Sequence, residues 1–246
     1  MKKIKLDVVT LIDPDSFFAE QYRTIRTNIE FLMDKDNLKS ILLTSANSGE
    51  GKTTTILNLA VIFAKAGKKV LLIDGDLRKQ SLTTNFNVHN ARGFIELLQG
   101  GKNLNDGIYD TTVEQLFFLP SGMPVTNPAE VLLNNHFESF LEELKQNFDL
   151  ILFDTPPIEE VADTLIISQK LDGCVLVVRE NYSKKDAVKR TKEALDDIGA
   201  TCLGIIHNDV SITKNKNEYY GYPYGKRSRL TNKQKKIFRV LRNKKN

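Results

Sequence analysis

The sequence has no long hydrophobic run and only two cysteines, and each scarcity excludes a class of protein. No apolar stretch approaches the roughly 18 residues that a membrane-spanning helix needs. The basic N-terminus is followed by Asp7, Asp13 and Asp15, where a secretory signal peptide requires an apolar segment. We therefore expect a cytoplasmic protein without a membrane span.

The cysteines and the three histidines do not predict a metal centre or a disulfide framework. Cys174 and Cys202 each lie in an apolar, strand-like stretch, which is typical of buried, reduced thiols. The histidines show no metal-ligand spacing among themselves or with the cysteines. An iron–sulfur ATPase, which would use a cysteine pair to bridge a cluster, is therefore disfavoured.

Charge is unevenly distributed along the 246 residues, whose formal net charge is +4. Ten Lys and Arg and no acidic residue fall within residues 226–246. The rest of the chain holds 25 basic and 31 acidic side chains, so an acidic body carries a basic tail. Such asymmetry is typical of a segment that interacts with a partner. We do not expect that partner to be a nucleic acid.

Short apolar runs alternate with stretches of helical periodicity along the middle of the chain. The predicted strands are residues 40–45, 69–74, 116–119, 149–154, 173–179 and 201–207, and the predicted helices are 16–33, 52–65, 136–146, 161–170 and 184–198. This alternation predicts an α/β fold with a P-loop NTPase-like, mostly parallel sheet covered by helices on both faces. Ligands of such sheets bind at the carboxyl ends of the strands.

A candidate phosphate-binding loop lies between the first predicted strand and the following helix, where Gly49 begins a G-x-G-K-T pattern. Its glycines allow backbone N–H groups to surround phosphate oxygens, and the helix directs its positive N-terminus at the same anion. Lys52 would neutralise the β- and γ-phosphates of ATP, and the Thr53 hydroxyl would ligate Mg²⁺. Ala46 stands where the general pattern has its first glycine. The expected nucleotide-binding residues are Gly49, Glu50, Gly51, Lys52, Thr53 and Thr54.

Aspartates follow two of the predicted strands, at the sheet edge where the loop also lies. Asp74 and Asp76 follow residues 69–73, and Asp154 follows residues 149–153. Unpaired acids there would cost stability, and a metal–nucleotide pair is their natural partner. We therefore expect a Mg²⁺ site formed by Thr53 and these three aspartates.

Together the motifs make the chain resemble the bacterial tyrosine kinases (BY-kinases) of capsule and exopolysaccharide synthesis, of the stand-alone CpsD/CapB type, over about residues 14–224. The matching residues are Gly49, Gly51, Lys52 and Thr53 for Walker A, Asp74, Asp76 and Arg78 for the D-x-D-x-R motif called Walker A′, and Asp154 to Pro157 for Walker B. The resemblance implies a protein-tyrosine autokinase that uses ATP and Mg²⁺ and regulates polysaccharide synthesis and export.

The resemblance also implies roles for single residues. Asp74 and Asp76 would help to hold Mg²⁺ and orient the tyrosine hydroxyl, and Asp154 would polarise the metal and its waters. With Lys52 they form the expected catalytic set; either Asp74 or Asp76 could accept the phenol proton, and the sequence leaves open which. Asn208 is the candidate for adenine contact, because related proteins place an asparagine at that position.

Four of the seven tyrosines lie within six residues, at Tyr219, Tyr220, Tyr222 and Tyr224. Their segment has neither a helical nor a strand period, so we expect it to be flexible enough to reach a bound phosphate. Together with the resemblance, this predicts autophosphorylation at these tyrosines. The alternative is a loop that packs its aromatic rings on the domain or on a partner.

Residues 226–246 follow the tyrosines, and their apolar residues recur at helix-like spacing among basic ones. A basic amphipathic helix of this kind would bind an anionic membrane surface. A solvated, disordered tail is the alternative. We divide the chain into an N-terminal segment (1–37), a kinase domain (38–212), a tyrosine cluster (213–225) and this basic tail.

The N-terminal helix carries Glu20, Arg23 and Arg26 three residues apart, on one helical face. The resemblance implies that this E-x-x-R-x-x-R pattern joins subunits into a ring, in which one subunit phosphorylates the tail of the next. A solvated Glu–Arg pair is the alternative.

The resemblance further implies a transmembrane activator or chain-length protein whose cytoplasmic juxtamembrane segment binds the kinase, together with a tyrosine phosphatase. The kinase would then be peripheral at the inner face of the cell membrane. The chief alternative function is a positioning ATPase of the MinD/ParA type, which has an extra lysine where this chain has Asn47 and lacks a tyrosine cluster. A nucleotide-bound scaffold without chemistry is a second alternative, which intact Lys52 and Asp154 disfavour.

Overall fold

The computed structural model describes residues 3–88, 92–100 and 104–211. The four tail tyrosines and residues 226–246 lie outside these ranges, so the predictions made for them stay predictions. The chain divides into two units, Met1–Val210 and Ser211–Asn246, and all described residues except Ser211 belong to the first. The elements described below all belong to the first unit.

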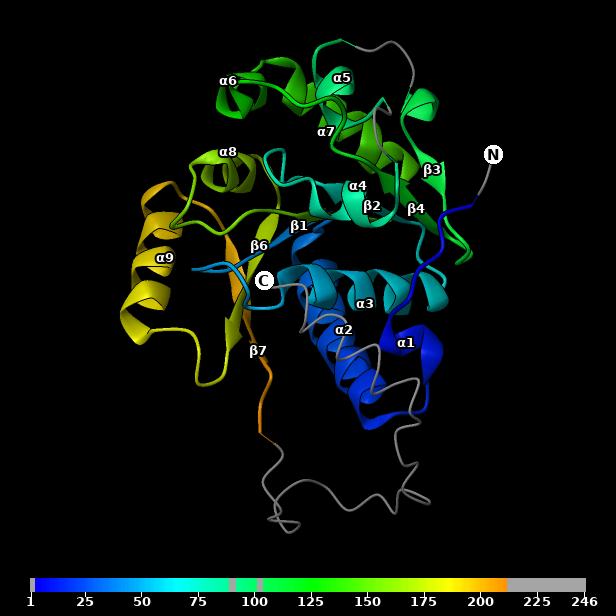
Figure 1. Ribbon diagram of the computed structural model, residues 1–246, viewed down its shortest axis with the longest axis vertical. Coiled ribbons are helices and arrows are strands. Elements are labelled where there is room, and N and C mark those ends of the chain that lie inside the picture. The colour runs from blue at the N-terminus through cyan, green and yellow to red at the C-terminus, as the bar shows by residue number, and fades with distance from the viewer. Residues whose placement is uncertain (1–2, 89–91, 101–103, 212–246) are drawn as a thin grey trace. The chain divides into compact units, whose positions relative to one another are not determined.

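The described residues form a seven-stranded sheet in the order β3-β4-β2-β5-β1-β6-β7 (Figure 1). The strands are β1 (Ser40–Thr44), β2 (Val70–Asp74), β3 (Tyr109–Asp110), β4 (Leu116–Leu119), β5 (Leu150–Asp154), β6 (Gly173–Arg179) and β7 (Cys202–Asn208). All neighbouring strands are parallel except β3 and β4. The predicted mostly parallel sheet is therefore confirmed, and the two residues of β3 were too few for the sequence to indicate.

The helices connect these strands and cover both faces of the sheet. They are α1 (Val9–Ile12), α2 (Phe17–Asp36), α3 (Lys52–Lys65), α4 (Ser81–Asn85), α5 (Phe94–Leu98), α6 (Pro128–Leu132), α7 (His136–Asn147), α8 (Asp163–Lys170) and α9 (Lys185–Asp197), with a 3₁₀ turn at Leu104–Asp106. Helix α3 begins and ends at the predicted residues. Helices α1, α4, α5 and α6 were not predicted, because four or five residues are too few to display a helical period.

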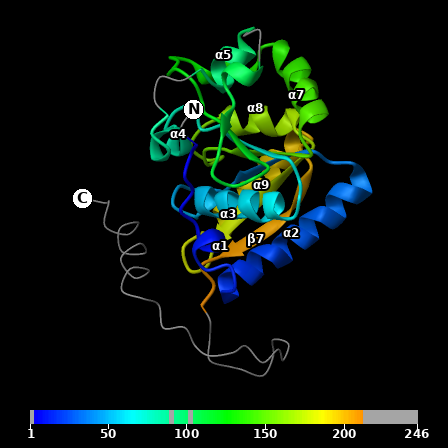
Figure 2. The same ribbon diagram turned by 90° about the vertical axis from the view of Figure 1, so that its right-hand side faces the viewer.

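Alternating side chains of the buried strands supply two hydrophobic cores, as the pleat of a strand requires. Ile41 and Leu43 of β1 belong to one core, together with residues of α2 and α3. Leu42, between them, belongs to the other core, with residues of α5, α7 and α8. Figures 1 and 2 show α2 and α3 on one side of the sheet and α5, α7 and α8 on the other. Packing in the two cores fixes β1, β2 and β5 from both faces, so that the carboxyl ends of these strands lie together at one edge of the sheet.

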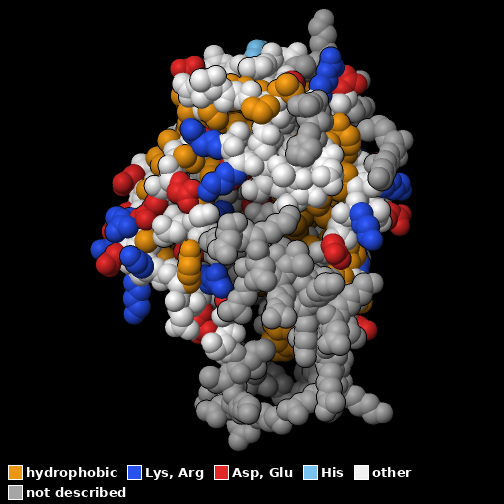
Figure 3. Space-filling model, viewed as in Figure 1, with side chains coloured by type: hydrophobic (Ala, Val, Ile, Leu, Met, Phe, Trp, Pro, Cys, Tyr) orange, Lys and Arg blue, Asp and Glu red, His pale blue; other side chains and the backbone are white. Residues whose placement is uncertain are grey.

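The surface over α9 is strongly charged, with acidic and basic side chains intermixed (Figure 3). Lys189 pairs with Glu193 and Lys192 with Asp196, each one helical turn apart. Across the described ranges, no helix combines the length and the apolarity that crossing a bilayer takes.

The two cysteines lie on neighbouring strands, and both are free thiols, as predicted. Cys174 of β6 is paired in register with Cys202 of β7. Cys174 is buried, whereas Cys202 is only half-buried because β7 lies at the edge of the sheet.

Candidate active site

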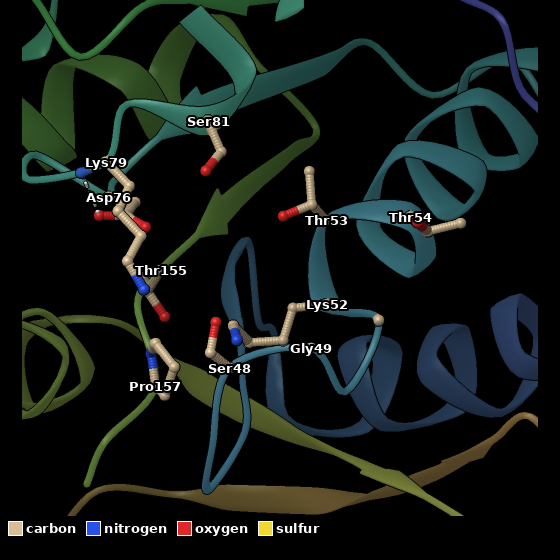
Figure 4. Close-up of a pocket in the computed structure, with 11 residues that line it drawn as sticks. Ser48, Gly49, Lys52, Thr53, Thr54, Asp76, Lys79, Ser81, Thr155 and Pro157 are labelled. Carbon is tan, nitrogen blue, oxygen red and sulfur yellow. Dashed lines mark hydrogen bonds between the residues drawn. The ribbon is translucent and has the colours of Figure 1, made fainter. Parts of the chain in front are cut away.

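A pocket lies where β1, β2 and β5 end, between the loop that precedes α3 and the segments that follow β2 and β5 (Figure 4). Its lining residues are Ser48, Gly49, Gly51, Lys52, Thr53, Thr54, Asp76, Lys79, Ser81, Thr155 and Pro157. Five of the predicted nucleotide-binding residues therefore line one pocket together with Asp76. Neither Lys79 nor Ser81 was singled out from the sequence.

The phosphate-binding loop requires glycine at two positions because of its backbone conformation. Gly49 has φ +82° and Gly51 has φ +95°, in the left-handed region that side chains disfavour. A Cβ at Gly51 would also lie 2.1 Å from Nδ2 of Asn208. The loop thus keeps a form in which its N–H groups can approach an anion closely.

Lys52 is the buried cation of the pocket, with 8% of its surface exposed. Its Nζ donates a hydrogen bond to Oγ of Ser45 at 2.8 Å. Burial lowers the pKa of Lys52, and the charges of Asp154, Glu50 and Asp76 oppose that change. A buried ammonium with a single neutral hydrogen-bond partner favours binding of an anion such as a phosphate.

Asp154 is buried at the end of β5, and one of its oxygens has no partner among the described residues. Its Oδ2 accepts a hydrogen bond from Oγ1 of Thr53 at 2.7 Å, and the oxygen without a partner is Oδ1. Burial and the charge of Asp74 raise the pKa of Asp154 to about 7. Asp74 is its partner in the register of β2 and β5. The orphaned oxygen beside a hydroxyl fits a hydrated Mg²⁺, which prefers oxygen ligands.

Asp74 is fully buried, and hydrogen bonds occupy both of its oxygens. Oδ2 accepts from the backbone N and the hydroxyl of Thr83, at 2.8 and 2.7 Å, and Oδ1 accepts from the backbone N of Asp76 at 3.3 Å. The Thr83 hydroxyl in turn accepts from the backbone N of Ser121. Burial raises the pKa of Asp74 to about 6, and its bonds to Thr83 limit the rise. Asp74 therefore organises the segment after β2 and does not line the pocket.

Asp76, in contrast, lines the pocket and caps the turn that follows it. Its Oδ1 accepts from the backbone N of Arg78 at 3.3 Å and of Lys79 at 2.9 Å. The Arg78 guanidinium makes two hydrogen bonds, of 2.7 and 3.0 Å, to the buried carboxylate of Asp163 at the start of α8. This bidentate pair anchors the turn to a second helix, so the position of Asp76 is held from both sides.

The predicted metal ligands do not form an all-protein cage. Within the ranges that the structure describes, no three His, Cys, Asp or Glu side chains come together as a metal site. Mg²⁺ usually keeps several waters and binds through one or two carboxylates plus substrate phosphates. Thr53 and Asp154 fit that mode better than the full predicted set of Thr53, Asp74, Asp76 and Asp154.

Glu50 and Asn208 support the loop from behind, and neither side chain lines the pocket. The Glu50 carboxylate is buried and accepts hydrogen bonds from Oγ of Ser183 at 2.5 Å and from the backbone N of Asn47 at 3.4 Å. Nδ2 of Asn208 donates to the carbonyl oxygen of Glu50 at 3.0 Å. Glu50 could therefore contact a nucleotide only through its backbone. Asn208 could do so only through its backbone or its side-chain amide oxygen.

The last residue of β6 and the segment after it add further contacts to the loop that the sequence did not indicate. Tyr182 donates its hydroxyl to the carbonyl of Ser48 at 3.0 Å, and Arg179 donates to the carbonyl of Gly49 at 3.2 Å. The Arg179 guanidinium also lies 5.1 Å from the centroid of the Tyr182 ring. No local motif surrounds these residues, and the only available signal was that Arg179 ends a strand of the same sheet and Tyr182 follows it.

Helix α2 carries the predicted interface residues on an otherwise partly apolar surface. Glu20 and Arg23 form an ion pair of 2.7 Å, and Arg26 pairs with Glu30 at 3.4 Å. Nε of Arg26 is buried without a hydrogen-bond partner. The same helix leaves three large side chains exposed, namely Phe17, Phe18 and Phe31.

Comparison with known proteins places the chain among nucleotide-binding proteins. Residues 38–196 match a family model described as an AAA domain. The chain is 39% identical to the tyrosine-protein kinase YwqD of Bacillus subtilis, over 94% of this chain and 96% of that protein. It is 40% identical to the tyrosine-protein kinase CpsD of Streptococcus pneumoniae, over 85% and 92% of the two chains.

Solved structures give a consistent result. The kinase domain of the Escherichia coli tyrosine kinase ETK superposes with a TM-score of 0.79 at 27% identity, covering 91% of this chain and 87% of that one. The chimerical protein CapA2B2 superposes with a TM-score of 0.76 at 34% identity, covering 84% and 93%. The septum site-determining protein MinD of Pyrococcus horikoshii, complexed with Mg-ADP, reaches only 0.57 at 27% identity and covers 69% of each chain. The likeness to MinD thus concerns the fold.

Proposed function

The chain belongs to the bacterial tyrosine-protein kinases, and we propose that it transfers the γ-phosphoryl group of ATP to tyrosines of its own C-terminal segment. The observation that carries this proposal is the pocket formed by the glycine loop, buried Lys52 and the Thr53–Asp154 pair. The sequence adds Tyr219, Tyr220, Tyr222 and Tyr224 as the proposed acceptors. The products are ADP and phosphotyrosine.

In this proposal the loop and Lys52 position the triphosphate. Backbone N–H groups at Gly49, Gly51 and Lys52 surround the phosphates, and the N-terminus of α3 adds its dipole. Lys52 leaves Ser45 to contact the β- and γ-phosphates. Thr53 and Asp154 would hold a bound Mg²⁺, which neutralises charge on the phosphates.

We assign the general base to Asp76 and a positioning role to Asp74. Asp76 lines the pocket, whereas both oxygens of Asp74 are occupied by hydrogen bonds. The phenolic oxygen attacks the γ-phosphorus, the bond from that phosphorus to the ADP oxygen breaks, and the phenol proton passes to Asp76. Since phosphoryl transfer depends mainly on positioning and charge neutralisation, the well-anchored turn that carries Asp76 suits this role.

The function is tested by incubating the full chain with ATP and Mg²⁺ and probing for phosphotyrosine. We expect a signal in the wild type and its loss when the four tail tyrosines are replaced together by phenylalanine. The matched control is Tyr109→Phe, which changes a tyrosine outside the tail. Undiminished labelling of the four-tyrosine variant would contradict the assignment of the acceptors, and a wild type that stays unlabelled even with its activating partner present would contradict autophosphorylation.

The proposed assembly is a ring in which α2 of one subunit contacts the next. Its support is that α2 exposes Phe17, Phe18 and Phe31 and also carries Arg23 and Arg26. A large exposed apolar surface mixed with arginine is typical of interfaces.

Replacing Arg23 and Arg26 together by alanine should convert an oligomer into monomers, as measured by light scattering after size-exclusion chromatography. Fold should be retained, because both side chains are partly exposed and their ion pairs lie within α2 itself. Lys189→Ala on α9 serves as a control that removes a basic side chain from another helix, where it also forms an ion pair with a residue one turn away. An unchanged molecular mass of the double variant would contradict the interface.

The remaining partners follow from the family and are also proposals. They are a transmembrane activator that binds through a cytoplasmic juxtamembrane segment, a tyrosine phosphatase, and an anionic membrane surface for residues 226–246. Through the activator the kinase would act at the inner face of the membrane, in the control of capsular or exopolysaccharide synthesis.

A further inference from the structure

A second lysine lines the active-site pocket on the wall that faces the glycine loop. Of the pocket-lining residues in the described part of the chain, Lys52 and Lys79 are the cations. Figure 4 shows the side chain of Lys79 extending toward Thr155 and Pro157, on the opposite side of the pocket from Thr53 and Thr54. The pocket therefore has a lysine on each of two walls.

The backbone of Lys79 is held firmly, whereas its ammonium group is not. Its N–H donates to Asp76, and the preceding Arg78 is anchored to buried Asp163. The ammonium makes one ion pair, of 2.9 Å, with Glu160, and both side chains are substantially exposed. Exposed pairs of this kind are weak, so the ammonium can exchange Glu160 for a stronger anion.

The reaction requires positive charge on this wall. In phosphoryl transfer the charge spreads over three equatorial oxygens of the transferred group, between the attacking and the leaving oxygen. Lys52 reaches that group from the side of the glycine loop. Asp76, the proposed base, lies in the same turn as Lys79, so a tyrosine that approaches Asp76 also brings the transferred group near Lys79.

We propose that Lys79 is a catalytic residue that contacts the transferred phosphoryl group during the reaction, and that Glu160 holds its ammonium in the resting enzyme. This proposal rests on the proposed function. Lys79 contributes little to binding of ADP, because its contact forms with the γ-phosphoryl group. Its effect is therefore confined to the rate of transfer and to complexes that mimic the transition state.

The test compares Lys79→Met, Lys79→Arg and Glu160→Gln in the full chain, measuring autophosphorylation against ATP concentration. We expect Lys79→Met to lower kcat about 10- to 100-fold with KM for ATP nearly unchanged. Lys79→Arg should recover part of the rate because it keeps the charge, and Glu160→Gln should retain much more activity than Lys79→Met. Lys189→Met, which removes the lysine of another exposed Lys–Glu pair, is the matched control and should equal the wild type.

A binding measurement separates this proposal from the kinase function itself. ADP with Mg²⁺ and aluminium fluoride mimics the transferred group, and Lys79→Met should weaken its binding about tenfold while leaving ADP binding unchanged. An unchanged kcat in Lys79→Met would overturn the proposal. Equal losses of activity in Lys79→Met and Glu160→Gln would also overturn it, because a purely structural ion pair predicts the same loss when either partner is removed. If the wild type bound this mimic through Lys79 but labelled no tyrosine, the role of Lys79 would stand and the kinase assignment would fall.

Discussion

Replacing Asp154 by asparagine should raise the thermal stability of the nucleotide-free protein at pH 8 while it abolishes phosphoryl transfer. The wild-type carboxylate is buried, one of its oxygens has no partner, and Asp74 lies on the neighbouring strand in register. Asparagine keeps the shape and can still accept from Thr53, but it carries no charge. Because the cost of burying the Asp154 charge and its repulsion from Asp74 outweigh the attraction of Lys52, removing this charge should stabilise the fold by about 1–3 kcal/mol.

The sign of the pH dependence follows from the raised pKa. The pKa of Asp154 is about 7 in the folded chain and near 3.8 otherwise, so the folded chain binds this proton more tightly than the unfolded chain. The stabilising contribution of the protonated acid is present below about pH 4 and is lost as the pH rises through about 7. The advantage of Asp154→Asn should therefore grow between pH 5 and pH 8.

Differential scanning calorimetry across that pH range measures this effect. For a domain of this size, the expected gain corresponds to a Tm increase of about 2–10 °C at pH 8. Asp172→Asn is a control for which the expected change in stability has the opposite sign. Burial acts to raise the pKa of Asp172, but hydrogen bonds from Lys145, Lys39 and Ser40 outweigh burial, so the pKa is lowered. The same substitution there should destabilise the protein at pH 8. A lower Tm for Asp154→Asn at pH 8 would contradict the metal-site interpretation.

Replacing Lys52 by methionine should reduce the autophosphorylation rate about 10²- to 10³-fold, the usual loss when one preorganised electrostatic group is removed. Lys52 lies at the start of α3, is almost fully buried and bonds only to Ser45 through its ammonium group. Methionine fills a similar volume, so the fold should persist. Because burial lowers the pKa of Lys52, removing the ammonium should not destabilise the nucleotide-free chain.

Single-turnover labelling with radioactive ATP measures the rate, and fluorescent ADP measures binding separately. Lys65→Met changes the last residue of the same helix, whose Nζ donates to the carbonyl of Thr10, and should leave the rate within about twofold of the wild type. Lys52→Arg should stay impaired, since the larger guanidinium does not fit the space beside Ser45. A rate for Lys52→Met within tenfold of the wild type would show that another group neutralises the phosphates.

Several features of the site could be predicted because they depend on residues close together in the sequence. The glycine loop, Lys52 and Thr53 occupy one short segment between a strand and a helix, and five of the seven predicted nucleotide-binding residues, all except Glu50 and Asn208, line the pocket. The two aspartate clusters were expected at one sheet edge, and Asp74 and Asp154 are indeed register partners. Strand-end positions follow from the alternation of apolar runs alone.

Other features depend on contacts between distant segments, which no local pattern encodes. The difference between Asp74 and Asp76 comes from Thr83 and, through it, from Ser121. The orientation of Glu50 depends on Ser183, 133 residues away, and that of Asn208 on a carbonyl 158 residues away.

The sequence by itself determined the sheet, the phosphate-binding loop and the kinase family, because hydrophobic periodicity and short motifs act over a few neighbouring residues. Only the tertiary structure decided which carboxylate lies open to the pocket, which side chains support the loop from behind, and that Lys79 faces Lys52. Those outcomes depend on parallel strands ending side by side, which brings residues far apart in the chain within hydrogen-bonding distance.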